Sequence, residues 1–235
     1  DIAPPMNKPK LILHIGHPKT GTTSLQDFFL KKSAQLVKLG YLYPTRNSPN
    51  SNHIVIPAGF VRSEGFRTPH YLTYQNNFKR FERDFDRFWE ALVSDIQDYS
   101  PHTVILSSEW MFSDFSKNSR VPLAEFLGQY FSSVKVVAYI RSPVSDYFSS
   151  LAQRIKTGYL IPNPSARKIR AIIEYYLEQF PNSVDLHPFD RQQLLAGDVR
   201  HDFLSRYVPE ALTSIDMPRI GEANVSLPWP LLRGL

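Results

Sequence analysis

Residues 16–24 (GHPKTGTTS) bring together two glycines, one lysine and four hydroxyl side chains. Gly16 and Gly21 have the spacing of a phosphate-binding loop, whose lysine position is occupied here by Thr22. The lysine of this segment, Lys19, lies inside the turn instead. Backbone N–H groups at the start of a helix attract anions, and hydroxyls and a lysine add donors and charge. The segment therefore predicts an anion-binding turn, with a turn that binds nothing as the alternative.

Two further charged side chains directly follow apolar runs that are typical of buried strands. Glu109 comes just after residues 103–107 (TVILS), and Arg141 follows residues 134–140 (VKVVAYI). Because the carboxyl ends of parallel strands meet at one edge of a sheet, both should lie near the loop. There Glu109 can take a proton from a hydroxyl, and Arg141 can offer a planar fork to a phosphate. The structural alternatives are a helix N-terminal carboxylate and a surface ion pair.

His53 is a second candidate base. It lies within residues 44–76, which are rich in Pro, Asn, Ser and Gly and predict loops around a short helix near 53–60. His53 can also be an acceptor contact or a core histidine whose hydrogen bonds are satisfied within the protein. The choice between Glu109 and His53 stays open at this point.

The elements that must position these residues alternate along the chain. Short apolar runs predict strands at 10–15, 103–107, 134–140 and 184–187. Apolar spacing of three and four predicts helices at 22–39, 78–100, 122–131, 143–157, 166–180 and 198–207, with an irregular stretch over 208–235. This alternation predicts an α/β fold, a three-layer sandwich whose mainly parallel sheet of about four to five strands is flanked by helices. A phosphate-binding-like loop follows the first strand, and a tail at 1–9 precedes a single domain at 10–235.

Composition narrows the classes of partner. The 27 basic and 22 acidic residues leave a net charge of +5, and the basic residues are scattered, which favours a small anionic ligand over nucleic acid. The absence of cysteine excludes disulfides, Cys-ligated zinc and a Cys nucleophile, and it is typical of a reducing compartment such as the cytoplasm. No apolar run approaches the length of about 18 residues that a membrane span needs. Met6 is a candidate first residue of the natural protein.

Four segments resemble motifs of the sulfotransferases that use 3′-phosphoadenosine 5′-phosphosulfate (PAPS), in particular bacterial-type enzymes similar to carbohydrate sulfotransferases. Residues 11–26 (LILHIGHPKTGTTSLQ) resemble their 5′-phosphosulfate loop, in which the lysine lies within the turn. Residues 136–150 (VVAYIRSPVSDYFSS) look like their 3′-phosphate motif. Residues 107–110 (SSEW) are similar to the segment with the catalytic carboxylate, and 224–227 (NVSL) to a late loop that closes over the nucleotide.

The resemblance implies PAPS as co-substrate, 3′,5′-adenosine bisphosphate as product, and a hydroxyl of a carbohydrate or small molecule as acceptor. Lys19 would stabilise the leaving phosphate, Glu109 or His53 would act as base, and no metal is required. The implied nucleotide-binding residues are His17, Pro18, Lys19, Thr20, Gly21, Thr22, Thr23, Ser24, Arg141, Ser149, Asn224 and Ser226.

Two other functions compete with this one. A kinase with a modified phosphate loop is disfavoured by Thr22 at the lysine position and by the absence of an aspartate for Mg²⁺ just after residues 103–107. A non-catalytic nucleotide-binding protein of the same fold is the other alternative, and only an assay separates it from the enzyme.

Overall fold

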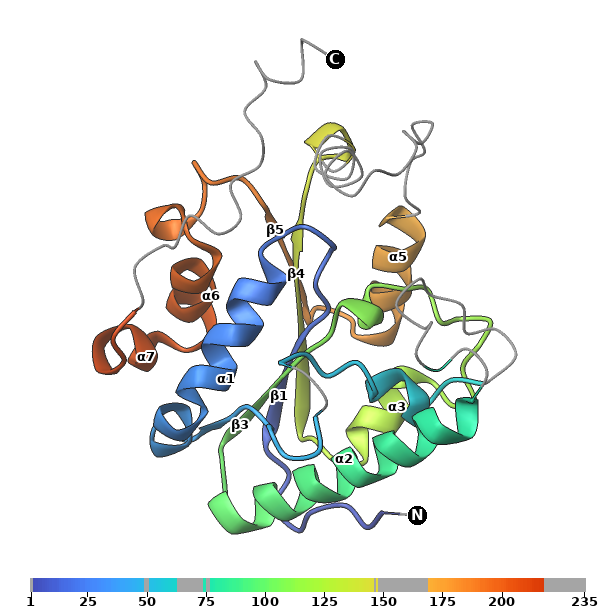
Figure 1. Ribbon diagram of the computed structural model, residues 1–235. Helices are drawn as coiled ribbons and strands as arrows, with labels where there is room; N and C mark the ends of the chain where they lie inside the picture. Colours follow the sequence, from blue (N-terminus) through green and yellow to red (C-terminus); the bar gives the residue numbers. More distant parts are fainter. Residues whose placement is uncertain are drawn as a thin grey trace.

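The computed structural model describes residues 2–48, 51–62, 74, 77–145, 147 and 169–217. Within these ranges, five parallel strands form one sheet between two layers of helices (Figure 1). The strands are β1 (Lys10–His14), β2 (Tyr41–Leu42), β3 (Thr103–Ser107), β4 (Ser133–Ile140) and β5 (Val184–Pro188). The α-helices are α1 (Thr22–Lys38), α2 (Phe78–Tyr99), α3 (Leu123–Gly128), α5 (Ile169–Gln179), α6 (Val199–Tyr207) and α7 (Pro209–Ser214). The described 3₁₀-helices are η1 (Ile56–Gly59), η3 (Glu109–Met111) and η4 (Leu195–Gly197). The predicted α/β sandwich is confirmed.

The order of the strands, β2-β3-β1-β4-β5, places β1 at the centre of the sheet. Lys10 at its start aligns with Thr103 of β3 on one side and with Ser133 of β4 on the other. From β1 the chain continues to β2 at one edge of the sheet, and from β4 it continues to β5 at the other edge. The two connections therefore diverge between the neighbouring strands β1 and β4. Ligands of open α/β sheets bind at such a point, beyond the carboxyl ends of the strands. The segments that follow β1 and β4 are therefore the place to look for a site.

Successive side chains of the central strand β1 pack into two different hydrophobic cores. Leu11 and Leu13 of β1 belong to the core beneath α2, α3 and α5, whereas Ile12 belongs to the core beneath α1, α6 and α7 (Figure 1). Such strands, covered on both faces, are the reason why the sequence shows continuous apolar runs rather than alternation. The same alternation decides on which face each residue beyond a strand end lies.

Several details of the chain differ from the sequence predictions. The strand β2 was not predicted, because it contains only Tyr41 and Leu42, and its pairing with β3 leaves no periodic signal in so short a stretch. The helix expected over 122–131 ends at Gly128. The short helix expected over 53–60 is a single 3₁₀ turn.

The expectation of an irregular stretch over 208–235 is wrong in its first part. Residues 209–214 form α7, which starts with Pro209 in its first turn and buries Ala211. Proline is favoured at the first helical position because its missing N–H is not needed there. Residues 143–145 and 147 are helical, as predicted, and the rest of the helix expected to 157 lies outside the described residues. Within the described ranges, no helix has both the length and the apolar character needed to cross a membrane.

Candidate active site

The segment between β1 and α1 forms a tight loop with three left-handed residues. Gly16, Lys19 and Gly21 have φ angles of 44°, 66° and 73°. A left-handed φ is uncommon for a residue other than glycine, and such strained positions cluster at functional sites. Gly21 is the N-cap of α1 and carries no side-chain cap. The first N–H groups of α1 are therefore not satisfied by a capping side chain, which suits them to bind an anion.

The two glycines allow close approaches that a Cβ atom would block. A Cβ on Gly16 would lie 2.8 Å from Cγ2 of Thr22 and 3.5 Å from Cγ of Glu109. A Cβ on Gly21 would lie 2.9 Å from Cγ1 of Val199 in α6. Gly16 thus lets the loop close on itself beside the side chain of Glu109. The predicted neighbourhood of the loop and this carboxylate is present in the structure.

The hydroxyl groups of the loop divide into two pairs. The hydroxyls of Thr20 and Thr22 donate to the carbonyl of His17, at 2.5 and 3.5 Å, and both threonines are buried. Thr23 is exposed and Ser24 is half-buried. The first pair therefore holds the loop in shape, and the second pair lies where a ligand can reach it. Sequence reasoning expected the hydroxyl of Thr22 to serve as a donor to the anion, whereas in the structure it donates to the carbonyl of His17.

The remaining side chains of the loop, those of His17, Pro18 and Lys19, differ in how far they are buried. His17 is fully buried, and its ring packs edge-on against Phe112 with 4.9 Å between the ring centres. Pro18 is half-buried, whereas the side chain of Lys19 is exposed. The lysine is therefore the member of the loop that can bring a mobile positive charge to a bound anion.

Glu109 is the first residue of η3 and is half-buried. The preceding residue, Ser108, donates its N–H to the carbonyl of His14 at 3.0 Å, which fixes this turn to the end of β1. Among the described residues, the carboxylate of Glu109 has no hydrogen bond or ion pair. A half-buried carboxylate beside this loop can accept a proton.

His53 is buried in the core, and both of its ring nitrogens contact the backbone. The N–H of Ser107 donates to Nδ1 of His53 at 3.0 Å. The proton of the neutral ring is therefore on Nε2, which donates to the carbonyl of Pro44 at 2.9 Å. This is the arrangement of the core histidine that the sequence left open as an alternative, and it leaves no lone pair of the ring for an acceptor.

Ser107 is the centre of a buried polar network that sequence reasoning missed. Its hydroxyl contacts Nδ1 of His14 at 2.8 Å and accepts from Nε2 of Gln26 at 3.0 Å. Its carbonyl accepts from the backbone N–H of His53 at 2.9 Å. The network thus joins β1, α1, β3 and the segment of His53 directly beneath the loop and the turn of Glu109. A polar residue at the end of an apolar strand run is the signal that could have revealed it.

Two of the buried histidines, His14 and His53, should make stability depend on pH. Burial lowers the pKa of His14 and of His53 from 6.5 to about 4. The unfolded chain therefore takes up protons below pH 6.5 that the folded protein does not, so stability present above pH 6.5 is lost as the pH falls towards 4. We expect the free energy of unfolding to fall by about 2 kcal/mol per histidine between about pH 7 and pH 5.

Urea denaturation at several pH values tests this expectation. Replacement of His53 by glutamine should lower stability at neutral pH, because the new side chain cannot make both backbone contacts, but it should flatten the slope below pH 6.5. A variant with the slope of the wild type would contradict the neutral state that we assign to His53.

Arg141 lies one residue beyond β4, at the edge of the sheet that carries the loop. Val137 and Tyr139 of β4 face the core beneath α1, so the alternation along the strand brings Arg141 to the same face. Its guanidinium carbon lies 5.1 Å from the ring centre of Phe189, the residue that follows β5. A Cβ on Gly21 would lie 3.4 Å from the same ring. Phe189 therefore connects Arg141 with the start of α1.

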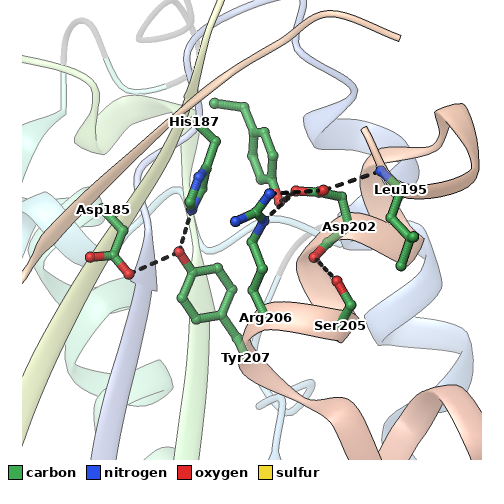
Figure 2. A network of polar contacts seen from close by, with 8 residues as sticks. Asp185, His187, Leu195, Asp202, Ser205, Arg206 and Tyr207 are labelled. Carbon is green, nitrogen blue, oxygen red and sulfur yellow. Dashed lines mark hydrogen bonds and ion pairs between the residues drawn. The ribbon is translucent and has the colours of Figure 1, made fainter. Parts of the chain in front are cut away.

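A polar network holds β5 against α6 (Figure 2). The hydroxyl of Tyr207 donates to Oδ2 of Asp185 at 3.0 Å, and Nε2 of His187 contacts the same hydroxyl at 2.6 Å. Asp202 of α6 accepts from the hydroxyl of Tyr139 at 2.8 Å and from Nε of Arg206 at 2.8 Å. These contacts fix the strand that ends just before Phe189 and the helix whose Val199 lies against Gly21.

Three predicted site residues, Ser149, Asn224 and Ser226, lie outside the described residues. In the described part of the chain, no group of three His, Cys, Asp or Glu side chains is arranged to hold a metal ion.

Comparisons with known proteins give structural similarities only. No family model and no curated protein matches this chain. A sulfotransferase from Alicyclobacillus acidocaldarius is similar at a TM-score of 0.43 and 15% identity, over 97% of this chain and 90% of that one. A putative kinase from Chloroflexus aurantiacus gives 0.40 and 17%, over 89% and 98% of the two chains. The sulfotransferase domain of an olefin synthase from Synechococcus gives 0.36 and 13%, over 99% and 84%. Similarities at these TM-scores do not decide between the activities.

Proposed function

We propose that this protein is a sulfotransferase that moves a sulfuryl group from PAPS to a hydroxyl of a carbohydrate or small-molecule acceptor. The observation that carries the proposal is that the loop with its uncapped helix and Arg141 lie at the ends of two neighbouring strands, β1 and β4. A ligand with two separate anionic groups fits this pair better than one with a single phosphate chain. The motif resemblance of both segments to the two phosphate-binding motifs of sulfotransferases supports the same conclusion.

The nucleotide would be held by its two phosphate ends. The N–H groups at the start of α1, together with Thr23 and Ser24, would bind the 5′-phosphosulfate. Arg141 would offer its planar fork to the 3′-phosphate, a charge-assisted contact that is specific in geometry. By resemblance, Ser149 would join Arg141, and residues 224–227 would cover the nucleotide. The tight loop, whose glycines admit no Cβ, is the feature that fits an anion at this position.

The reaction needs charge stabilisation on one side of sulfur and a base on the other. The acceptor oxygen forms a bond to sulfur while the bond from sulfur to the bridging oxygen breaks. Negative charge then grows on the leaving phosphate, where Lys19 and the N–H groups of the loop stabilise it. The hydroxyl proton of the acceptor passes to the carboxylate of Glu109. The products are a sulfate ester, 3′,5′-adenosine bisphosphate and a protonated Glu109.

The proposal predicts a clear preference for a nucleotide with a 3′-phosphate. We expect 3′,5′-adenosine bisphosphate to bind at least about tenfold more tightly than ADP in the absence of Mg²⁺, because a charge-assisted bidentate contact contributes about 1.5–3 kcal/mol. Isothermal titration calorimetry of both nucleotides measures this preference.

A matched pair of variants locates the preference. Arg141→Met should abolish it, whereas Arg83→Met, which removes an exposed arginine of α2, should keep it. Equal affinities in the wild type, or a strict need for Mg²⁺, would instead favour a nucleotide-dependent kinase.

A further inference from the structure

We propose that Gln26 and Ser107 are positioning residues, which hold the carboxylate of Glu109 at a fixed place beside the start of α1. This inference rests on the proposed function, and its tests are arranged so that the two can fail separately. Neither Gln26 nor Ser107 was among the candidate site residues that the sequence indicated. Their role follows from a buried chain of hydrogen bonds that runs from α1 through the end of β3 to the end of β1.

Gln26 is a polar side chain on the buried side of α1. It is 2% exposed, and Leu25 and Phe29 of the same helix are fully buried in hydrophobic core. A buried amide costs free energy unless its hydrogen bonds are made. Nε2 of Gln26 donates to Oγ of Ser107 at 3.0 Å. This contact joins the first turns of α1 to the last residue of β3.

The hydroxyl of Ser107 continues the chain in one direction. Besides the amide of Gln26, it contacts Nδ1 of His14 at 2.8 Å. Burial lowers the pKa of His14 to about 4, so this ring is neutral at neutral pH. Because the hydroxyl accepts from the amide and has a single proton, that proton goes to Nδ1, and the proton of the ring lies on Nε2. The chain therefore runs from Gln26 through Ser107 to His14.

The main chain of Ser107 is held as firmly as its hydroxyl. Its N–H donates to Nδ1 of His53 at 3.0 Å, and its carbonyl accepts from the N–H of His53 at 2.9 Å. The next N–H along the chain, that of Ser108, donates to the carbonyl of His14 at 3.0 Å. Buried polar networks whose groups are paired in this way are rigid. Since Glu109 directly follows Ser108, the network fixes the point at which the chain leaves β3 towards Glu109.

The same chain sets the spacing between two parts of the candidate site. Gln26 anchors the helix whose first N–H groups would bind the 5′-phosphosulfate, and Ser107 anchors the turn of Glu109. The two parts approach closely at Gly16, where a Cβ would lie 3.5 Å from Cγ of Glu109. A base must reach the acceptor hydroxyl while the loop holds the sulfuryl group. A shift between α1 and β3 would therefore lower the turnover without removing any group that binds the nucleotide.

A kinetic test separates positioning from binding. Gln26→Met removes the donor and keeps a side chain of similar length. We expect it to lower the turnover about 10–100-fold, as a misplacement of about 1 Å between reacting groups does. The affinity for 3′,5′-adenosine bisphosphate should stay within about twofold, because the loop keeps all its donors. Ser107→Ala should show the same division between turnover and affinity.

Both quantities can be measured before the natural acceptor is known. The turnover is followed as release of 3′,5′-adenosine bisphosphate from PAPS, with a set of monosaccharides, simple alcohols and water as acceptors. The affinity for the bisphosphate is measured by calorimetry. Tyr41→Phe is the matched control, because it removes the hydrogen bond of 2.9 Å to Oε2 of Glu210 next to Thr103, at the opposite end of β3. It should change neither quantity.

A double-mutant cycle shows whether the chain acts through Glu109. In a Glu109→Gln background, Gln26→Met should lower the turnover no further, since the base that it positions is already absent. A residue that only stabilised the fold would lower the free energy of unfolding and leave the turnover of the folded protein intact.

Nuclear magnetic resonance tests the chain of hydrogen bonds without any measurement of activity. Long-range ¹H–¹⁵N correlation spectra show which ring nitrogen of a histidine carries the proton. At neutral pH, we expect the proton of His14 on Nε2. The signal of its Nδ1 should shift in Ser107→Ala, which removes the hydroxyl that donates to it.

The outcomes separate the two proposals. A wild type that releases no bisphosphate from PAPS with any of these acceptors would overturn the proposed function. A proton on Nδ1 of His14 would overturn the proposed chain, whether or not the protein is active. An active wild type with full turnover in Gln26→Met would overturn the positioning role alone. So would a further fall in turnover in the Glu109→Gln background, because the chain would then act without the carboxylate.

Discussion

Replacement of Glu109 by glutamine is expected to lower the turnover about 10²–10⁴-fold, the usual span of general-base catalysis. Glutamine has the same shape but cannot accept the proton of the acceptor hydroxyl. The affinity for 3′,5′-adenosine bisphosphate should stay within about twofold, since the carboxylate has no place in holding the nucleotide. Both quantities can be measured on one acceptor, as product nucleotide released from PAPS and as binding by calorimetry.

Two companion variants make this result specific. Glu90→Gln removes an exposed carboxylate of α2 and should leave the turnover unchanged. His53→Gln should lower stability through its lost contacts with Ser107 and Pro44, with no selective loss of turnover in the protein that remains folded. Near-normal turnover of Glu109→Gln, together with a large loss in His53→Gln, would remove Glu109 from the mechanism.

Replacement of Lys19 by alanine should lower the turnover far more than it weakens the binding of the product nucleotide. The lysine acts on charge that grows as the bond to the leaving phosphate breaks, whereas the N–H groups of α1 hold the charge of the ground state. Loss of one such stabilising group typically costs about 10²–10³-fold in turnover. Initial rates at saturating PAPS, with calorimetry of 3′,5′-adenosine bisphosphate, give the two effects.

An exposed lysine of the adjoining helix provides the control. Lys31→Ala changes the net charge by the same amount and should affect neither quantity. If Lys19→Ala raised only KM and left the turnover intact, Lys19 would be a ground-state contact and not a group that stabilises the transition state.

The sheet could be predicted from the sequence wherever a strand is covered on both faces. Residues 103–107 form a continuous apolar run because both faces of β3 are buried, and the predicted bounds agree with the structure. The two residues of β2 could not be predicted in this way. Tyr41 and Leu42 are extended because they pair with Thr103 and Val104, and that pairing depends on the fold as a whole.

The charged residues of the candidate site could be predicted from the sequence, but the residues packed around them could not. The sequence indicated that the loop, Glu109 and Arg141 share one edge, since each follows a predicted parallel strand. It left the role of His53 open, because the partners of that ring are backbone atoms, which have no signature in the residue types. Phe189 was missed for a related reason. Its place beside Arg141 depends on the register of β4 and β5, which no local pattern specifies.

The central position of β1 has a consequence for how the chain folds during synthesis. Lys10 pairs with Thr103 on one side and with Ser133 on the other. The strand β1 therefore leaves the ribosome long before β3 and β4, the two strands with which it pairs, have been synthesised. At the usual rate of about 5–20 residues per second, roughly 6–25 s pass between the appearance of Lys10 and that of Ser133 on the ribosome. Contacts so distant in sequence also slow folding, because the chain must close long loops before they form. During this interval the apolar strand is without its second neighbour, and unpaired strand edges of this kind are prone to aggregate.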